Sequence, residues 1–364
     1  MDVRTISSRY GGFWNFDVQD FCYMTNRYFP PEEFLGSLAS NLGTLLGSYP
    51  STNSHLSCLV AEAMGSDGDK TVVANGASEL ISAIASLRME HLAIPVPTFD
   101  EYRNRVLLQG KQVSPYLAEA DFTLDVDGFI AHVQRSKADS VVIVRPDNPA
   151  GTLVSREDIV RMLQAFGSLG LVLIDESFLY FAGPDYRDLS VAGLIDRFPN
   201  LVIVNSMSKA YGVPGLRLGY AMSGDRDFVK DLRAALPIWS INSFAQFFLE
   251  HVGDYEAQFE RSCEQVRNAT DSLFRGLLTV DFVDPYPTRA NYVLCRTQDP
   301  LTGSGVTERL FQDFGVLVND CSGKSGLDSR FFRVAARTTE ENEGLVRILR
   351  EMVIGATTLG GMRR

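Results

Sequence analysis

Three apolar runs of the sequence are each followed, within a few residues, by a side chain that can do chemistry. The runs cover residues 140–144, 171–174 and 201–204. Asn148 follows the first run, Asp175 the second and Lys209 the third. Each run is apolar throughout, which is typical of strands buried on both faces of a parallel sheet. Because ligands bind outside the carboxyl ends of such strands, the sequence predicts a site there with an amide, a carboxylate and an amine.

This combination matches the needs of pyridoxal 5'-phosphate (PLP). Its aldehyde forms a Schiff base with a lysine amine, and its pyridine nitrogen needs an anion that keeps the ring an electron sink. Its phenolate oxygen needs a hydrogen-bond donor. Lys209, Asp175 and Asn148 supply these three groups in turn, and we predict that they are the catalytic residues.

Two segments are suited to the cofactor phosphate. Hydroxyls and a guanidinium follow the third run, and a glycine-led turn after residues 72–73 opens a helix-like stretch whose first N–H groups can bind an anion. The predicted phosphate ligands are Ser206, Ser208, Arg217, Gly76, Ala77 and Ser78. Phe99 lies in a loop where an aromatic ring could stack on the flat cofactor.

A second anion site is predicted near the C-terminus. Residues 331–337 have the pattern of a strand, and a period of two places Arg333, Ala335 and Arg337 on one face. Two arginines separated by a small residue suit a substrate carboxylate and a second anion.

Each of these residues also has an ordinary structural interpretation. Lys209 could be a solvated lysine, Asp175 a helix cap and Asn148 a turn former. Residues 76–78 could simply begin a helix, and Arg337 could be a solvated charge. The shared position after an apolar strand favours a functional role for the first three.

The hydrophobic pattern indicates an α/β fold. Between about residues 70 and 225, apolar runs alternate with helix-like stretches such as 155–166, as in parallel βαβ units. A long helical pattern covers residues 244–278, and the remainder mixes strands with a terminal helix near 340–354.

We therefore predict two domains. Residues 30–250 form a large PLP-binding domain around a mainly parallel sheet flanked by helices. Residues 1–29 and 251–364 form a smaller α+β domain.

The ordered motifs resemble those of the fold-type I, class I/II aminotransferase superfamily. Within it the chain is most similar to histidinol-phosphate aminotransferases and threonine-phosphate decarboxylases. The motifs are N-P-x-G at 148–151, D-E-x-[YF] at 175–178, S-x-S-K at 206–209 and G-x-R-x-G-[YF] at 215–220, and Arg333 matches the carboxylate-binding arginine of the superfamily. The resemblance implies a PLP-dependent transferase fold and supports the assignments above.

Three positions qualify this resemblance. Phe178 stands where aminotransferases usually carry a tyrosine that contacts the cofactor, and Asn319 stands where an arginine commonly grips the substrate phosphate. Arg27 is the candidate to replace that charge. Tyr49 matches a tyrosine that reaches the cofactor phosphate of the neighbouring subunit, which implies a homodimer with shared active sites.

Three functions follow from these residues. The first, which we favour because transamination is the more common activity of this architecture, is an aminotransferase for a small amino acid or phosphorylated amine. The second is a decarboxylase of an O-phospho amino acid such as phosphothreonine or phosphoserine. The third is a PLP-fold binding module without catalysis, against which the intact Lys209 argues.

Composition narrows the expected partners. The chain of 364 residues has a formal net charge of -11, which argues against nucleic acid or an anionic membrane as a partner. No run is apolar enough to span a membrane, and residues 1–15 contain no signal-peptide core. The five cysteines and four histidines show no metal-ligand spacing. We expect a cytoplasmic enzyme without a metal ion, acting on a small amino acid or phospho amino acid.

Overall fold

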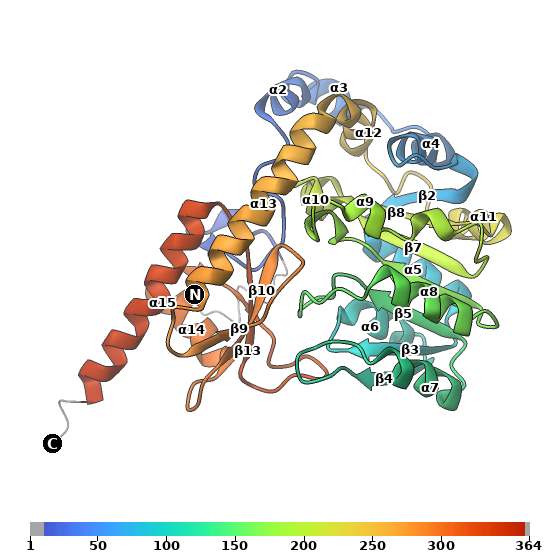
Figure 1. The fold of residues 1–364 in the computed structure, drawn as a ribbon. Helices are drawn as coiled ribbons and strands as arrows, with labels where there is room; N and C mark the ends of the chain where they lie inside the picture. The colour runs from blue at the N-terminus through green and yellow to red at the C-terminus, as the bar shows by residue number, and fades with distance from the viewer. Residues whose placement is uncertain (1–10, 361–364) are drawn as a thin grey trace.

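Two sheets lie side by side, and a long helix runs between them (Figure 1). The computed structural model describes the backbone of residues 11–360 and the side chains of residues 11–352. The first ten residues of the predicted small domain therefore lie outside the described part.

The larger sheet has seven strands in the order β2-β8-β7-β6-β5-β3-β4. They are β2 (Thr71–Asn75), β3 (His91–Val96), β4 (Gln112–Leu117), β5 (Ser140–Val144), β6 (Leu171–Asp175), β7 (Leu201–Ser206) and β8 (Leu218–Ser223). Only β8 runs antiparallel to its neighbours, so the prediction of a mainly parallel sheet is confirmed. The three apolar runs form the adjacent strands β5, β6 and β7.

Helices cover both faces of this sheet, which explains why its strands are apolar throughout. Val141 and Ile143 of β5 belong to the core that includes Ile159, whereas Val142 and Val144 belong to the opposite core. The first face carries α4 (Asn53–Ala63), α7 (Val126–Ser136) and α8 (Arg156–Ala165), and the second carries α5 (Ala77–Arg88), α6 (Asp100–Leu108) and α11 (Arg226–Ala235). Alternate side chains of a strand point to opposite faces, so both faces need apolar residues.

The smaller sheet is antiparallel and has the order β12-β13-β10-β9. Its strands are β9 (Val283–Pro285), β10 (Tyr292–Thr297), β12 (Asn319–Asp320) and β13 (Phe331–Ala335), and its helices are α13 (Glu256–Leu277), α14 (Gly303–Phe314) and α15 (Thr339–Gly360). The N-terminal strand β1 (Gln19–Asp20) pairs with β11 (Val316–Leu317) beside this sheet. The remaining helices are α2 (Glu32–Ser40), α3 (Leu42–Gly47), α9 (Tyr186–Leu189), α10 (Met207–Ala210) and α12 (Ser243–His251).

Two sequence predictions about element boundaries were wrong. The helix expected over residues 244–278 is divided into α12, a 3₁₀ turn at Val252–Tyr255 and α13. Gly253 lies in that turn and favours the break, because glycine is a poor helix former. The strand expected over 331–337 ends at Ala335, because the backbone N–H of Arg337 donates to the side chain of Asn342.

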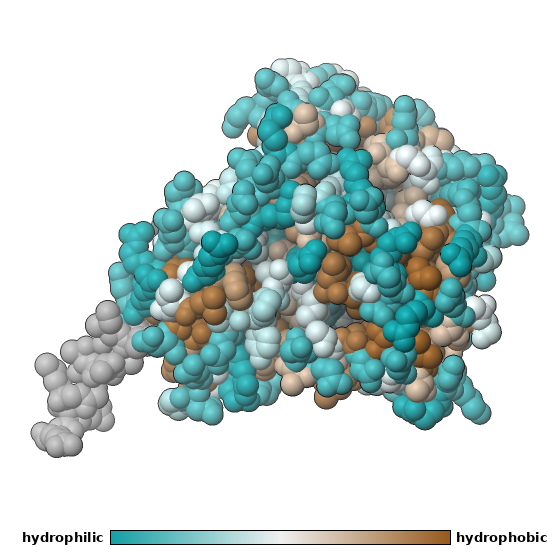
Figure 2. Space-filling model, in the orientation of Figure 1, coloured by the Kyte–Doolittle hydropathy of each residue, from teal (hydrophilic) through white to brown (hydrophobic). Residues whose placement is uncertain are grey.

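The face of the molecule in Figure 2 is largely hydrophilic, with scattered apolar patches. Among the described residues, no helix is both long and apolar enough to cross a membrane.

Candidate active site

The ends of β5, β6 and β7 bring the three predicted catalytic residues to one edge of the larger sheet. Asp175 is the last residue of β6, Lys209 lies on α10 directly after β7, and Asn148 lies in the loop after β5. The register pairs Asp175 with Val144 on one side and with Val204 on the other. The sheet topology therefore produces the cluster that the three apolar runs predicted.

The amine of Lys209 makes no hydrogen bond or ion pair with the described residues. Its pKa is lowered to about 8, first by burial and then by the positive charges of Arg333 and Arg217. The carboxylate of Asp175 acts in the opposite direction. A large fraction of this amine is therefore neutral near pH 8, which is the form that attacks an aldehyde.

Asp175 is buried, and both of its oxygens accept hydrogen bonds. Oδ1 accepts from the backbone N–H of Ser177 at 2.9 Å, and Oδ2 accepts from the Tyr102 hydroxyl at 2.8 Å. Burial raises the pKa of Asp175, while these hydrogen bonds and the charge of Lys209 oppose that rise. The sequence prediction missed Tyr102. The only sequence signal was its position on the helix that follows Phe99.

Arg333 contacts Asn148 across the gap between the two sheets. Its Nη1 donates to Oδ1 of Asn148 at 2.5 Å, and its Nη2 donates to the carbonyl of Cys22 at 2.8 Å. Its guanidinium also lies 5.3 Å from the ring centre of Tyr292. Because the amide oxygen of Asn148 is occupied, the amide nitrogen is left to donate elsewhere, as a contact to a phenolate oxygen requires.

The predicted phosphate ligands form a cradle. Gly76 precedes α5 with a φ of 77°, and Arg217 Nη2 donates to the Ser78 hydroxyl at 3.3 Å. A Cβ atom at position 76 would lie 2.3 Å from Arg217 Nη2, and the positive φ favours glycine there. The hydroxyl of Ser208 is buried without a hydrogen-bond partner among the described residues. A phosphate at this helix N-terminus would satisfy these donors, so the residues fit the cofactor.

The other predicted cofactor contacts lie around this cluster. Ala77 is the first residue of α5. The Ser206 N–H donates to the Ser177 hydroxyl at 2.9 Å. Phe99 is 37% exposed, and its ring is nearly perpendicular to that of Tyr102. Buried Phe178 packs edge-on against Tyr292, with 5.1 Å between the ring centres.

The predicted substrate residues separate into two groups. Arg337 lies outside β13 and donates to the Asp20 carbonyl and to Glu341. Arg27 has an exposed surface, but partial burial of its guanidinium, followed by the positive charge of Arg337, lowers its pKa. Arg333 is thus near Lys209, whereas Arg27 and Arg337 form a separate pair beside Asp20.

Asn319 lies between two thiols. Its amide nitrogen is 3.5 Å from the sulfur of Cys22, and its amide oxygen is 3.3 Å from the sulfur of Cys321. Burial raises the pKa of Cys321 to about 11, so this thiol stays neutral near pH 7. The position at which the related enzymes commonly carry an arginine is therefore uncharged here.

Tyr49 is 78% exposed. Its ring stacks on Trp239, with 4.4 Å between the ring centres. Leu46 and Ile238 are also largely exposed. An exposed apolar surface of this kind is typical of an interface.

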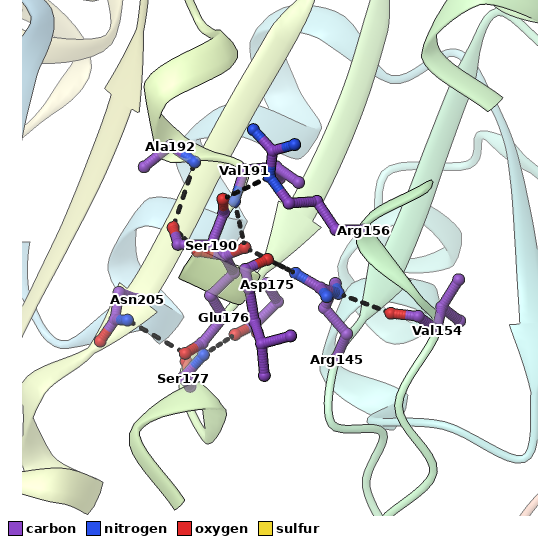
Figure 3. A network of polar contacts seen from close by, with 11 residues as sticks. Arg145, Val154, Arg156, Asp175, Glu176, Ser177, Ser190, Val191, Ala192 and Asn205 are labelled. Atoms are coloured by element: carbon purple, nitrogen blue, oxygen red, sulfur yellow. Dashed lines mark hydrogen bonds and ion pairs between the residues drawn. The ribbon is translucent and has the colours of Figure 1, made fainter. Parts of the chain in front are cut away.

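Glu176, the residue after Asp175, anchors the loops behind the site (Figure 3). It accepts hydrogen bonds from Arg145 Nη1 at 3.0 Å, from the Ser190 hydroxyl at 2.6 Å and from the Val191 N–H at 3.0 Å. Asn205 donates to its backbone carbonyl at 3.1 Å. Because the Arg145–Glu176 pair is buried and multiply hydrogen-bonded, it holds the ends of β5, β6 and β7 in place.

A cavity of about 1170 Å³ is lined by Glu176 and by residues that include Tyr180, Asn205 and Tyr220. Neither Lys209 nor Arg333 lines it, so it is separate from the predicted catalytic cluster. Within the described ranges, no group of three or more histidine, cysteine or acidic residues could hold a metal ion.

The fold and this cluster define a PLP-dependent enzyme of fold type I, with an α/β architecture around a mostly parallel sheet. The chain belongs to the aminotransferase class I and II family, whose model matches residues 13–349. The resemblance inferred from the motifs is thereby confirmed, and the family is PLP-dependent, which confirms the expected cofactor.

Three similar proteins show the range of this family. A CMP-5'-(3-aminopropyl)phosphonate synthase of Streptomyces rubellomurinus is 37% identical over 99% of the chain, which spans 58% of that relative. An L-serine phosphate decarboxylase of Campylobacter jejuni is 28% identical, covering 89% of the chain and 86% of the relative. The crystal structure of a histidinol-phosphate aminotransferase from Clostridium acetobutylicum has a TM-score of 0.84 at 26% identity, covering 92% and 99% of the two chains.

Proposed function

We propose that this protein is a PLP-dependent decarboxylase of a small amino acid that carries a phosphorus acid at its far end. The observation that carries the proposal is the similarity over 89% and 92% of the chain to two L-serine phosphate decarboxylases. The CMP-5'-(3-aminopropyl)phosphonate synthase, of which the chain spans 58%, supports a substrate that carries a phosphorus acid. Both names describe a small amine or amino acid that ends in a phosphorus acid. Decarboxylation was the second function predicted from the sequence, and these relatives support it better than transamination.

Each catalytic residue has a distinct task in this proposal. Bound PLP would supply the sink for the electrons that remain when carbon dioxide leaves. Asp175 would hold the pyridine nitrogen, and the free amide nitrogen of Asn148 would donate to the phenolate oxygen. Lys209, with its pKa lowered to about 8, would hold the cofactor aldehyde and then return a proton from Nζ to the substrate carbon. Arg333 would bind the substrate carboxylate.

The remaining predicted residues would hold and shape the site. Residues 76–78 would bind the cofactor phosphate together with Ser206, Ser208 and Arg217. Phe99 would stack on the cofactor ring, and Phe178 would pack beside it. Asn319, Arg337 and Arg27 remain predictions for the outer part of the substrate.

We also propose a homodimer with shared active sites, in which exposed Tyr49 reaches the cofactor phosphate of the partner subunit. The stacking of Tyr49 on Trp239 supports this assignment, because it fixes an exposed ring in one orientation. The larger sheet would belong to the cofactor domain of residues 30–250. The smaller sheet would belong to the second domain, formed by residues 1–29 and 251–364.

An aminotransferase is the second candidate, and the fold similarity to the histidinol-phosphate aminotransferase favours it. Both reactions use the same catalytic cluster. They differ in which bond of the substrate is held perpendicular to the cofactor ring.

The test is to incubate the PLP-loaded protein with L-phosphoserine, L-phosphothreonine and L-2-amino-4-phosphonobutyrate, and to measure carbon dioxide and amine. Parallel reactions contain L-glutamate with a keto acid, and Lys209→Ala is the inactive control. Stoichiometric carbon dioxide and amine from a phosphorus-bearing amino acid support the decarboxylase. Amino transfer from glutamate without carbon dioxide would replace it with the second candidate.

A further inference from the structure

The loop between β12 and β13 reaches from the smaller sheet to the larger one beside the predicted cofactor site. Lys324 Nζ in this loop lies 2.5 Å from Oδ2 of Asp100, the residue directly after Phe99. A Cβ atom on Gly326 would lie 3.0 Å from the backbone nitrogen of Pro97. The loop therefore packs closely against the segment that carries the predicted ring-stacking residue.

We propose that Lys324 binds the phosphorus acid at the far end of the substrate, in place of the arginine that Asn319 replaces. This inference rests on the proposed function, because it requires a substrate with an anion at each end. It adds a specificity-determining residue that neither the motifs nor the family resemblance identified.

Lys324 and Arg333 lie near the same buried thiol. The pKa of Cys321 is raised by burial, and the two charges that lower it most are those of Arg333 and Lys324. Asn319 contacts this thiol and carries no charge. Arg333 and Lys324 therefore supply two positive charges near Cys321, where Asp320 is the acidic group that opposes them. Two cations suit a ligand with a carboxylate at one end and a second anion at the other.

The ammonium of Lys324 is positioned by its loop. Its backbone N–H donates to the Cys321 carbonyl at 3.1 Å, and its own carbonyl accepts from the Leu327 N–H at 3.1 Å. Its side chain is 16% exposed, while that of its partner Asp100 is 32% exposed. Asp100 is the more exposed of the two partners, so a dianion that enters from its side can replace it as the partner of Lys324.

Arg27, the replacement predicted from the sequence, lies in a different environment. The charges that act on it are those of Arg337, Glu341 and Asp20. The charge of Lys324, in contrast, lowers the pKa of Cys321, the thiol that Asn319 contacts. Lys324 is therefore the better candidate for the far anion.

The test uses the PLP-loaded protein and amines that lack a carboxylate, so that Arg333 has no carboxylate to bind. Calorimetry compares O-phosphoethanolamine and 3-aminopropylphosphonate with ethanolamine for the wild type, K324M, K324R and D100N. K70M is the matched control, because Lys70 also pairs with an exposed aspartate, Asp196, at 2.8 Å. Circular dichroism and melting temperature verify that each variant is folded.

We expect K324M to weaken binding of the better phosphorus-bearing amine by at least about tenfold, as for a lost charge-assisted hydrogen bond, without affecting ethanolamine. K324R should retain most of the preference, and K70M all of it. D100N should tighten binding, because it releases the ammonium of Lys324.

Three outcomes would overturn the proposal. In the first, the wild type binds neither phosphorus-bearing amine more tightly than ethanolamine. In the second, K324M weakens the binding of the phosphorus-bearing amines and of ethanolamine equally. In the third, D100N weakens binding as K324M does, which would show that the Lys324–Asp100 ion pair has a structural role only. Carbon dioxide release from L-phosphoserine, measured separately, tests the proposed function: if it is absent while the K324M effect persists, the anion site stands without decarboxylation.

Discussion

The hydroxyl of Tyr102 donates a 2.8 Å hydrogen bond to Oδ2 of Asp175, the buried carboxylate at the end of β6. This bond opposes the rise of the Asp175 pKa that burial causes. Tyr102→Phe removes the hydroxyl and leaves the ring in place. The carboxylate becomes less stable, its pKa rises, and it becomes a weaker partner for a protonated ring nitrogen. We expect the turnover rate to fall about tenfold, measured as carbon dioxide release.

Tyr116→Phe is the matched control for this variant. Its hydroxyl also donates to an aspartate, Asp125, but at 3.3 Å and away from the cluster. Its turnover should equal that of the wild type. A Tyr102→Phe variant with unchanged turnover and an unchanged pH profile would show that Ser177 alone supports Asp175.

The strands that carry the predicted catalytic residues were predictable because their signal is local. An apolar run marks a strand buried on both faces, and the residue after it must lie at the sheet edge. Asn148, Asp175 and Lys209 follow from that rule alone. The role of Gly76 was likewise predictable, because the turn that precedes a helix depends on adjacent residues.

The contacts around the cluster were not predictable in this way. Arg333 and Asn148 are 185 residues apart, and their hydrogen bond exists only because the two sheets pack together. The alternating pattern correctly placed Arg333 in a strand but failed for Arg337, whose backbone N–H is taken by Asn342. Lys324 lies in a loop without periodicity, so no sequence pattern indicated its position.

The lowered pKa of Lys209 predicts how the apoprotein captures its cofactor. Below pH 8 the amine is mostly protonated and cannot attack an aldehyde, and above pH 8 it is mostly neutral. The rate of appearance of the visible absorbance band after PLP addition should rise with pH, with a midpoint near 8. The ordinary pKa of a lysine amine is 10.5, so an amine with an unshifted pKa would give a much higher midpoint.

The variant Arg333→Gln tests whether the charge of Arg333 lowers the pKa of Lys209. Arg333 is the charge that lowers the pKa of Lys209 most, so its removal should move the midpoint to higher pH. Lys209→Ala should show no such band. A midpoint that stays the same in Arg333→Gln would contradict the electrostatic explanation.

The buried carboxyl of Asp147, next to Asn148, predicts a pH dependence of stability. Burial raises its pKa from 3.8 to about 7, although the Thr98 hydroxyl, the Asn148 N–H and the charge of Lys324 oppose the rise. At a pH between the unfolded pKa of 3.8 and the folded pKa of about 7, Asp147 is protonated in the folded protein and ionised in the unfolded chain. Stability from this group is therefore lost as pH rises from about 4 through 7.

Asp147→Asn removes the ionisable group and nearly preserves its shape. Between pH 5 and pH 8, the melting temperature of the wild type should fall relative to that of the variant by about 2 °C or more, measured by differential scanning calorimetry. Parallel curves for the two proteins would show that Asp147 does not titrate in this range. The wild-type curve alone is not diagnostic, because other carboxyl groups titrate too.

Tyr49 provides a test of shared active sites that needs no structure of the dimer. Its ring is 78% exposed and stacked on Trp239, so in this subunit it contacts no residue of the catalytic cluster. Lys209→Ala should be inactive, and Tyr49→Ala should bind PLP about tenfold more weakly if it loses a hydrogen bond to the phosphate.

The two variants are mixed, dissociated and reassembled at a PLP concentration that leaves Tyr49→Ala mostly unloaded. If Tyr49 serves the partner subunit, each hybrid dimer contains one intact site, and activity returns towards a quarter of the wild-type value. If Tyr49 serves its own subunit, every site in the hybrid carries a defect and no activity returns.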